Sequence, residues 1–401
     1  MSLKNKVIFI LGIAKYDGPY ESTSYTVAKY LARENDVYYI DHPYTWKDYL
    51  TKNDESYLKR KPYFAINSDG LIHTDIPRLK VLVVPPVMSI NFLPEGLLYR
   101  TLLNVNESII LSRVRKVIKA NHITDYIFIN SFNFHYPNVG RRLKPKVLAY
   151  HCVDPLIIDH DRKHGIDSER LLVRNSDVVI CTSKQLYLEK LKENKESYFI
   201  PNAADLTHSS KALSEGLELN PTIKDIPKPI IGYFGNIERR MDFDMLAEVI
   251  QLNPDKSFVF AGPIEGGYIP GNFEDYPNVY FTGRVPYSEM PAVIKGFDVA
   301  MIPFKKDEVS HNIFPLKLFE YLGAGKPVVA TNFNLDLKDF TREEVSYSAT
   351  AAEFSDALNR AIAEDSLQKK EIRLQIAREN TWDERLLEFS NLLERFYSKQ
   401  A

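Results

Sequence analysis

Short apolar runs alternate with helix-like segments over the first half of the chain. The runs cover residues 7–12, 37–41, 80–84, 126–130, 146–152, 177–181 and 198–201, and a helical pattern fills residues 22–34 between the first two. Continuous apolar runs separated by amphipathic helices are typical of strands that are buried on both faces of a parallel sheet. The pattern therefore predicts an α/β domain with a doubly wound, Rossmann-like sheet.

The same alternation returns after a polar segment rich in Pro and Ser, residues 207–228. Apolar runs at 229–235, 256–262, 278–283 and 297–303 follow, and residues 352–401 have a helical pattern. A chain of 401 residues is too long for one ordinary hydrophobic core. We expect two domains, residues 1–201 and residues 202–381.

The most informative stretch covers residues 307–331 and predicts a loop, a short helix and a strand. Asn312 is suited to cap the helix and Pro315 is tolerated in its first turn, whereas Gly323, Gly325 and Pro327 end it. Because this loop follows the apolar run 297–303, the free N–H groups of the first helical turn should lie at the carboxyl edge of a parallel sheet. That position favours a phosphate group.

Lys317 and Glu320 are three residues apart and therefore neighbours on the predicted helix. An ammonium group is suited to a diphosphate, and a carboxylate can accept hydrogen bonds from the two hydroxyls of a ribose. This helix is therefore predicted to hold a nucleoside diphosphate. The alternative is that Lys317 and Glu320 only pair with each other on an ordinary amphipathic helix.

This stretch resembles the donor-site signature of the group 1 (GT4-like) glycosyltransferases. The family has two Glu eight positions apart, then a turn of small residues and a Pro-Val-Val-Ala-Thr strand. Glu320 matches the second Glu and residues 325–331 match the turn and strand, but Asn312 stands in place of the first Glu. The run Pro-Leu-Lys-Leu-Phe-Glu-Tyr-Leu is similar to bacterial polysaccharide transferases of the teichuronic-acid and xanthan glucuronosyltransferase kinds.

The resemblance implies the GT-B fold, in which two Rossmann-like domains with doubly wound parallel sheets face a cleft. The N-terminal domain would bind the acceptor, and the last helix, residues 382–401, would cross back and pack on it. The C-terminal domain would bind a nucleotide sugar, with a UDP-sugar favoured, near a Gly-x-x-Gly turn followed by Arg239 or Arg240; the sequence leaves open which Arg points inward. The residues implied for the donor are Gly235, Asn236, Arg239, Arg240, Gly262, Arg284, Val285, His311, Asn312, Phe314, Leu316, Lys317 and Glu320.

Two places in the first domain are predicted to face the acceptor. The loop after the first strand, which contains Tyr16, Asp17, Gly18 and Ser22, resembles the family's acceptor-side loop; a turn with capping hydroxyls is the alternative. Farther along, the strand 146–152 brings His151, and just after it Asp154, to its carboxyl end. Both side chains are suitable general bases for an acceptor hydroxyl, and Asp154 has the alternative role of a loop cap beside a proline.

Composition narrows the functional classes. A formal net charge of −2 argues against a general nucleic-acid binder, and two cysteines exclude a disulfide scaffold. We expect a cytoplasmic protein, because the first apolar run lacks a signal-peptide cleavage site and no run approaches the about 20 residues of a membrane-spanning helix. Basic residues from 100 to 146 predict peripheral contact with an anionic membrane surface, or else solvated helix faces. They are Arg100, Arg113, Arg115, Lys116, Lys119, Arg141, Arg142, Lys144 and Lys146.

No metal site is predicted. The motif Asp242-Phe-Asp244 opens a helix, where carboxylates cap N–H groups, and the consecutive residues 159–161 do not converge on one ion. We therefore expect a metal-independent hexosyltransferase that needs no cofactor beyond its nucleotide-sugar donor. Its acceptor would be a glycan or a lipid-linked acceptor in bacterial surface polysaccharide synthesis. The alternatives are a non-hydrolysing nucleotide-sugar epimerase and, because Asn312 replaces a Glu, a non-catalytic nucleotide-sugar-binding protein.

Overall fold

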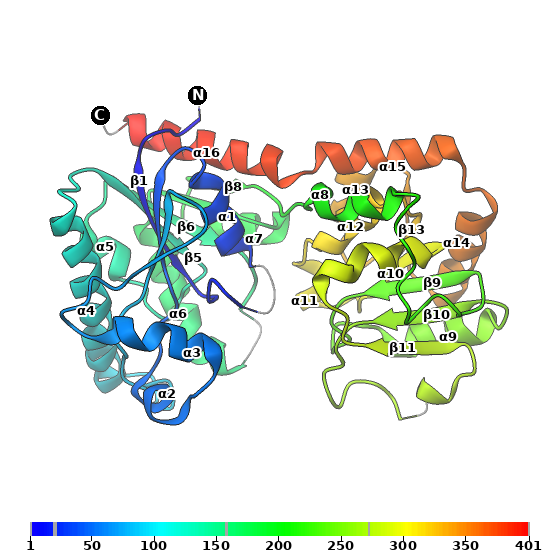
Figure 1. Cartoon of the computed structure of the whole chain (residues 1–401), viewed down its shortest axis with the longest axis horizontal. Coiled ribbons are helices and arrows are strands. Elements are labelled where there is room, and N and C mark those ends of the chain that lie inside the picture. The colour runs from blue at the N-terminus through cyan, green and yellow to red at the C-terminus, as the bar shows by residue number, and fades with distance from the viewer. Residues whose placement is uncertain (1, 19–21, 157–158, 272, 400–401) are drawn as a thin grey trace. The chain divides into compact units, whose positions relative to one another are not determined.

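The chain divides into two compact units, each built on its own sheet (Figure 1). The computed structural model describes residues 2–18, 22–156, 159–271 and 273–399. Unit 1 consists of Met1–Pro201 together with Leu386–Ala401, and unit 2 consists of Asn202–Arg385. The backbone leaves unit 1 at Pro201 and returns to it within the last helix.

Unit 1 has an eight-stranded sheet in the order β3-β4-β2-β1-β5-β6-β7-β8. All neighbouring strands are parallel except β3 and β4. The order reverses direction at β1, and ligands of doubly wound sheets bind at such a point, beyond the carboxyl ends of the strands. The strands are β1 (Val7–Gly12), β2 (Asp36–Ile40), β3 (Leu71–His73), β4 (Leu79–Leu82), β5 (Tyr126–Ser131), β6 (Val147–Cys152), β7 (Val178–Cys181) and β8 (Ser197–Phe199).

Helices cover both faces of this sheet, as the continuous apolar strands require. The last helix also packs in this unit, where Leu3 donates its backbone N–H to Ser390 Oγ at 3.0 Å. The helices of unit 1 are α1 (Thr23–Leu31), α2 (Trp46–Thr51), α3 (Glu55–Arg60), η1 (Lys61–Phe64), α4 (Leu97–Ala120), α5 (Val139–Leu143), α6 (Asp159–Asn175), α7 (Lys184–Lys190) and most of α16 (Trp382–Lys399).

Unit 2 has a six-stranded, fully parallel sheet in the order β11-β10-β9-β12-β13-β14. Counted from the first strand of the unit, this is the strand order 3-2-1-4-5-6 of the Rossmann fold, which reverses between β9 and β12. The strands are β9 (Ile230–Phe234), β10 (Ser257–Ala261), β11 (Val279–Gly283), β12 (Val299–Ile302), β13 (Val328–Thr331) and β14 (Val345–Ser348). The predicted fold class, two Rossmann-like parallel-sheet domains, is confirmed.

Most helices of unit 2 are short, and the longest are α14 and α15, with 13 residues each. They are α8 (Leu206–Ser209), η2 (Ser210–Leu213), α9 (Phe243–Leu252), η3 (Phe273–Asp275), η4 (Tyr287–Glu289), α10 (Met290–Gly296), α11 (Glu308–His311), α12 (Leu316–Gly323), η5 (Leu335–Leu337), α13 (Lys338–Thr341), α14 (Ala351–Ala363) and α15 (Leu367–Glu379). No helix of the described residues combines the length and the apolar character needed to cross a membrane.

The predicted capping role of Asn312 is wrong. Asn312 ends α11, donates from its side-chain amide to the carbonyl oxygen of Glu308 at 2.6 Å, and is separated from α12 by three residues. The N-cap of α12 is Pro315, which makes no side-chain cap. The residue before a proline avoids the helical region, so Phe314 interrupts what would otherwise be one helix.

The basic residues of α4 largely serve the fold of unit 1. Arg113 is buried and donates to the carbonyl oxygens of Tyr63, Ala65 and Ser68, and Lys116 donates to the carbonyls of residues 66–68. These two cations hold the segment before β3 against α4. The buried Arg113 is therefore not part of a free basic face, whereas Lys116 bonds to these carbonyls and stays exposed to solvent. Peripheral membrane contact stays a prediction.

Candidate functional site

The ends of two central strands of unit 2 meet at a pair of glycines. Gly235 follows β9 with φ +144° and Gly262 follows β10 with φ +150°, values that favour glycine. A Cβ atom on Gly262 would lie 2.1 Å from the carbonyl oxygen of Gly235, so the two backbones are in direct contact. The glycines keep the carboxyl edge of the sheet free of side chains at the point where the strand order reverses.

Lys317, in the first turn of α12, reaches this glycine edge. Its Nζ donates to Tyr233 Oη at 2.5 Å, and a Cβ atom on Gly235 would lie 2.7 Å from the same Nζ. The ammonium also lies 4.0 Å from the centre of the Tyr233 ring and 5.1 Å from that of Phe304. Burial, followed by the positive charge of Arg240, holds the pKa of Lys317 well below its usual range. An anion beside Nζ would offset this cost by stabilising the charged form of Lys317.

Of the two arginines after β9, Arg240 is the one near Lys317. Its guanidinium carbon lies 5.6 Å from the Phe304 ring centre, the ring that Lys317 also approaches, and its charge contributes to the lowered pKa of Lys317. Arg240 is held by an ion pair with Glu238. Lys317 and Arg240 thus place two basic side chains near the glycine edge, where a diphosphate would stabilise the charged form of Lys317.

Glu320 lies one turn after Lys317, on the same face of α12. Its Oε1 accepts a hydrogen bond from Tyr287 Oη at 2.7 Å. Burial raises the pKa of Glu320, and the bond from Tyr287 and the charge of Lys317 counteract that rise. Among the contacts of the described residues, Lys317 and Glu320 form no ion pair with each other, which argues against the alternative that they only pair.

Tyr287 and His208 complete this side of the site and were not anticipated from the sequence. The two rings stack with centres 4.5 Å apart, and His208 Nε2 lies 2.7 Å from the carbonyl oxygen of Tyr287. Tyr287 comes directly after the stretch Arg284-Val285-Pro286, which the family resemblance placed beside the nucleotide base. His208 lies in α8, within the polar segment interpreted as a linker, and no local pattern marked it.

The other predicted donor residues lie in less direct positions. Val285 is buried, Arg284 is exposed, and Phe314 is a core residue stacked on Phe319 with ring centres 5.5 Å apart. His311 Nδ1 is 3.3 Å from the carbonyl oxygen of Phe333, and Asn236 donates to Glu265 at 3.3 Å. The remaining ones, Arg239 and Leu316, are partly exposed.

Asn312 is buried in unit 2, and its Oδ1 has no hydrogen-bond partner in the described part of the chain.

Asp242 caps α9 by accepting from the backbone N–H of Met245 at 3.2 Å, as expected for the start of a helix. Within the described residues, no group of three or more His, Cys, Asp or Glu is placed to hold a metal ion.

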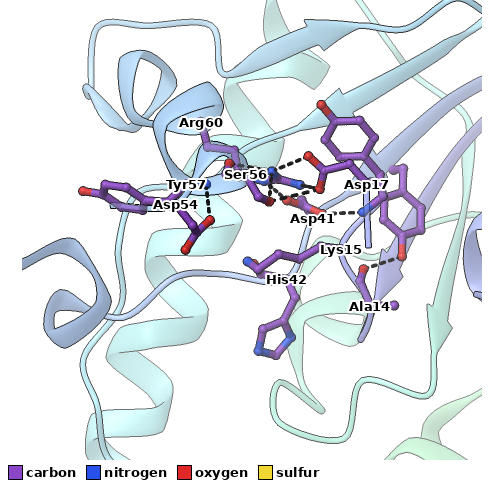
Figure 2. A network of polar contacts seen from close by, with 11 residues as sticks. Ala14, Lys15, Asp17, Asp41, His42, Asp54, Ser56, Tyr57 and Arg60 are labelled. Atoms are coloured by element: carbon purple, nitrogen blue, oxygen red, sulfur yellow. Dashed lines mark hydrogen bonds and ion pairs between the residues drawn. The ribbon is translucent and has the colours of Figure 1, made fainter. Parts of the chain in front are cut away.

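In unit 1, the predicted acceptor-side loop is anchored by an ion-pair network (Figure 2). The guanidinium of Arg60, which is fully buried, contacts Asp17 Oδ1 at 2.6 Å and Asp41 Oδ2 at 2.5 Å. The backbone N–H of Tyr16 donates to Asp41 Oδ1 at 3.1 Å. Burial raises the pKa of Asp17, but the bonds and charge of Arg60 outweigh this effect and lower it. The carboxylate of Asp17 is thus engaged within the fold.

The rest of this loop agrees with a turn that leads into a capped helix. Gly18 donates its backbone N–H to the carbonyl oxygen of Lys15 at 3.2 Å, and Ser22 caps α1 by accepting from the N–H of Tyr25. Residues 19–21 of the predicted loop lie outside the described residues. The capping alternative for Ser22 is therefore the one that the geometry supports.

The two candidate bases occupy different environments. His151 is buried in β6, where its Nδ1 lies 3.0 Å from Ser131 Oγ and its ring packs on Phe389 with centres 5.3 Å apart. Burial lowers the pKa of His151 to about 4. Asp154 follows the end of β6 and is exposed. Of the two, only Asp154 has solvent access for an acceptor hydroxyl within unit 1.

The buried His151 is expected to make unit 1 sensitive to acid. The pKa of His151 is about 4 in the folded state and 6.5 in the unfolded chain. Between these two pH values, the unfolded chain binds a proton at His151 that the folded chain does not, so the folded state loses stability as the pH falls. Lowering the pH from about 7 to about 5 should cost about 2 kcal/mol of unfolding free energy through this residue. Urea titrations at both pH values should show that His151→Gln removes this share, whereas His73→Gln, on the exposed edge strand β3, keeps it. Equal pH dependence in wild type and His151→Gln would contradict this account.

Comparisons with known proteins agree with the geometry. Residues 228–364, which contain Lys317 and Glu320, match the family described as "Glycosyl transferases group 1". The fold of the two units is similar to that of solved GT-B glycosyltransferases, and the resemblance to the group 1 family is confirmed for residues 228–364 of unit 2.

The most informative relative is TuaH of Bacillus subtilis (strain 168), which is named as a teichuronic acid biosynthesis glycosyltransferase. It is 28% identical over 240 residues, which are 57% of this chain and 59% of the relative, so the match spans somewhat more than half of each.

Among solved structures, the sucrose-phosphate synthase of Thermosynechococcus elongatus is similar with a TM-score of 0.67, at 14% identity over 98% of this chain and 100% of that chain. Anabaena Alr3699/HepE in complex with UDP is similar with a TM-score of 0.60, at 14% identity over 98% of this chain and 100% of that chain.

Proposed function

We propose that the protein is a glycosyltransferase that moves a hexose from a UDP-sugar to a glycan or lipid-linked acceptor. The observation that carries this proposal is the placement of Lys317 and Glu320 on one face of α12, at the glycine edge of β9 and β10. Lys317 and Arg240 would neutralise the departing diphosphate, and Glu320 would accept hydrogen bonds from the ribose. UDP is supported as the nucleotide by HepE, whose structure was determined with UDP.

The biological role that fits is the synthesis of a bacterial surface polysaccharide, in the cytoplasm at the inner face of the membrane. TuaH, named for teichuronic acid biosynthesis, supports it. A lipid-linked acceptor is supported by large apolar side chains that unit 1 leaves exposed on α2 and at the start of α4, among them Leu50 and Leu97 at 81% and 86% exposure. Such side chains can enter the headgroup region of a membrane.

The proposal is tested by measuring thermal unfolding with UDP-, GDP-, ADP- and dTDP-sugars. A ligand that binds only the folded protein raises its stability by mass action, by about 2.7 kcal/mol at a hundredfold excess over Kd. We expect UDP-sugars to raise the melting temperature most. If none of the four nucleotides raises it, the nucleotide-sugar proposal fails. Conversion of UDP-N-acetylglucosamine to its epimer without any acceptor would favour the epimerase alternative.

Transfer is predicted to be independent of divalent metal ions. The charges of Lys317 and Arg240 offer the diphosphate a cationic site, and Asp242 is engaged as a helix cap. Activity should therefore persist in EDTA, measured as UDP release with a crude glycan acceptor. Loss of activity in EDTA that Mg²⁺ or Mn²⁺ restores would contradict the prediction and return Asp242 and Asp244 as candidate ligands.

A further inference from the structure

Unit 1 contains a pocket that none of the predicted site residues lines. Its volume is about 280 Å³, and it lies at the carboxyl ends of β2, β4 and β5, against one face of α4. The loop after β2 contributes His42 and the helix α2 contributes Lys47. The loop after β4 contributes Phe92, and the loop after β5 contributes His135 and Tyr136. Carboxyl ends of parallel strands are where doubly wound sheets bind their ligands.

The wall formed by the loop after β4 is held in place from both ends. Asn106 of α4 clamps Met88 with two bonds of 2.9 Å, accepting from its N–H and donating to its carbonyl oxygen. At the other end, Lys163 donates to the carbonyl oxygen of Phe92 at 3.2 Å, and His164 Nε2 lies 3.1 Å from that of Leu93. The pocket is therefore formed by the fold itself and does not depend on a ligand to shape it.

His42 is oriented by the Arg60 network. Asp41 is tied to Arg60, and the next side chain along the extended chain, His42, points away from that network (Figure 2). Asn133 Nδ2 donates to the carbonyl oxygen of Gly12 at 2.8 Å, which fixes its amide orientation, and it lies 3.4 Å from His42 Nδ1. Nδ1 is therefore a hydrogen-bond acceptor, and the proton of the neutral ring sits on Nε2, from which a residue that lines the pocket can donate it to a ligand.

Both histidines of the pocket favour the neutral form. Burial, and then the neighbouring His135, lowers the pKa of His42 to about 3, and burial also lowers the pKa of His135. Their ring centres are 5.6 Å apart. The imidazole of His135 contacts the rings of His42, Phe134 and Tyr136, and it reaches a ligand as part of the pocket lining.

The residues that line the pocket favour a neutral sugar over a phosphate as its ligand. Among the lining residues that the structure describes, Lys47 is the one with a full charge, and the others are neutral polar or apolar. A phosphate would call for several cationic or backbone N–H donors, whereas a sugar ring offers hydroxyls at its edge and C–H groups on its faces. The volume is close to the lower end of ligand pockets, about 300 Å³, which suits one ring.

We propose that this pocket is the acceptor site and takes one neutral sugar unit, whose hydroxyls bind His42 and His135 and whose apolar face lies against Phe92. The inference rests on the proposed function and adds to it the class of acceptor: the bound unit carries no phosphate. The exposed ring of Phe92 is well suited to this packing because aromatic rings combine a large apolar surface with few rotatable bonds.

The test measures binding by saturation-transfer NMR and titration on the full chain, with UDP measured separately. The probes are methyl glycosides of glucose, galactose, mannose and N-acetylglucosamine, and glucose 6-phosphate. We expect at least one methyl glycoside to bind and His42→Phe and His135→Phe each to weaken it about five- to tenfold, as for the loss of one hydrogen bond. His73→Phe, at an exposed histidine of the same unit, should have no effect, and all variants should keep wild-type UDP affinity, which shows that they are folded.

Three outcomes would overturn the inference: no methyl glycoside binds, binding is unchanged in both pocket variants, or glucose 6-phosphate binds more tightly than the methyl glycosides. The UDP titration separates this failure from that of the proposed function. UDP binding without glycoside binding refutes the pocket assignment alone, whereas absence of UDP binding refutes the donor site in unit 2.

Discussion

Replacing Lys317 or Glu320 by Ala is expected to weaken UDP binding by about 1.5 to 3 kcal/mol each, the range for hydrogen bonds to charged groups. For Lys317, the reason is its position at the Gly235 backbone, where burial and Arg240 already disfavour its charge and where a diphosphate would pair with it. For Glu320, the reason is that its carboxylate is the acceptor best placed for ribose hydroxyls on the same face of α12. Calorimetric titration with UDP measures both effects.

The matched control is Lys224→Ala, which removes an exposed lysine from the same unit and should leave UDP affinity unchanged. Glu320 accepts a bond from Tyr287 and is proposed to accept bonds from the ribose. Tyr287→Phe separates these two roles, because it removes only the hydroxyl that donates to the carboxylate. It should change affinity less than Glu320→Ala does. Wild-type affinity in Lys317→Ala or Glu320→Ala, with an unchanged melting temperature, would remove that residue from the donor site.

The fold could be predicted because both sheets are buried on both faces. Their strands then appear in the sequence as continuous apolar runs, such as the segment that became β12, and helices between such runs require parallel strands. The prediction that failed concerns the start of one helix, α12. Asn312 has the chemistry of an N-cap, but Pro315 shifts the start of α12 by forcing Phe314 out of the helical region, and Asn312 becomes the end of α11.

The candidate site could be predicted where its residues are close in sequence. Lys317 and Glu320 are one helical turn apart, so their spacing alone places them on one face. Tyr287 meets Glu320 across 33 residues, His208 meets Tyr287 across 79, and Arg60 meets Asp17 across 43. Nothing in the local pattern records such contacts, since they arise only when the carboxyl ends of different strands come together. The pocket of His42 and His135 escaped prediction for the same reason.

Asp154→Asn is expected to lower kcat by about 10² or more, the usual scale of a general base, while UDP affinity stays unchanged. Direct displacement by an acceptor hydroxyl needs a base, and Asp154, exposed after β6, is the better placed of the two candidates because His151 is buried. Asp125→Asn is the matched control: it is an exposed carboxylate just before β5, at the opposite edge of the same sheet. Steady-state kinetics with anomeric analysis of the product decides the matter. An unchanged kcat together with retention of configuration would show that Asp154 is not the base, and its role would then be that of a loop cap before Pro155.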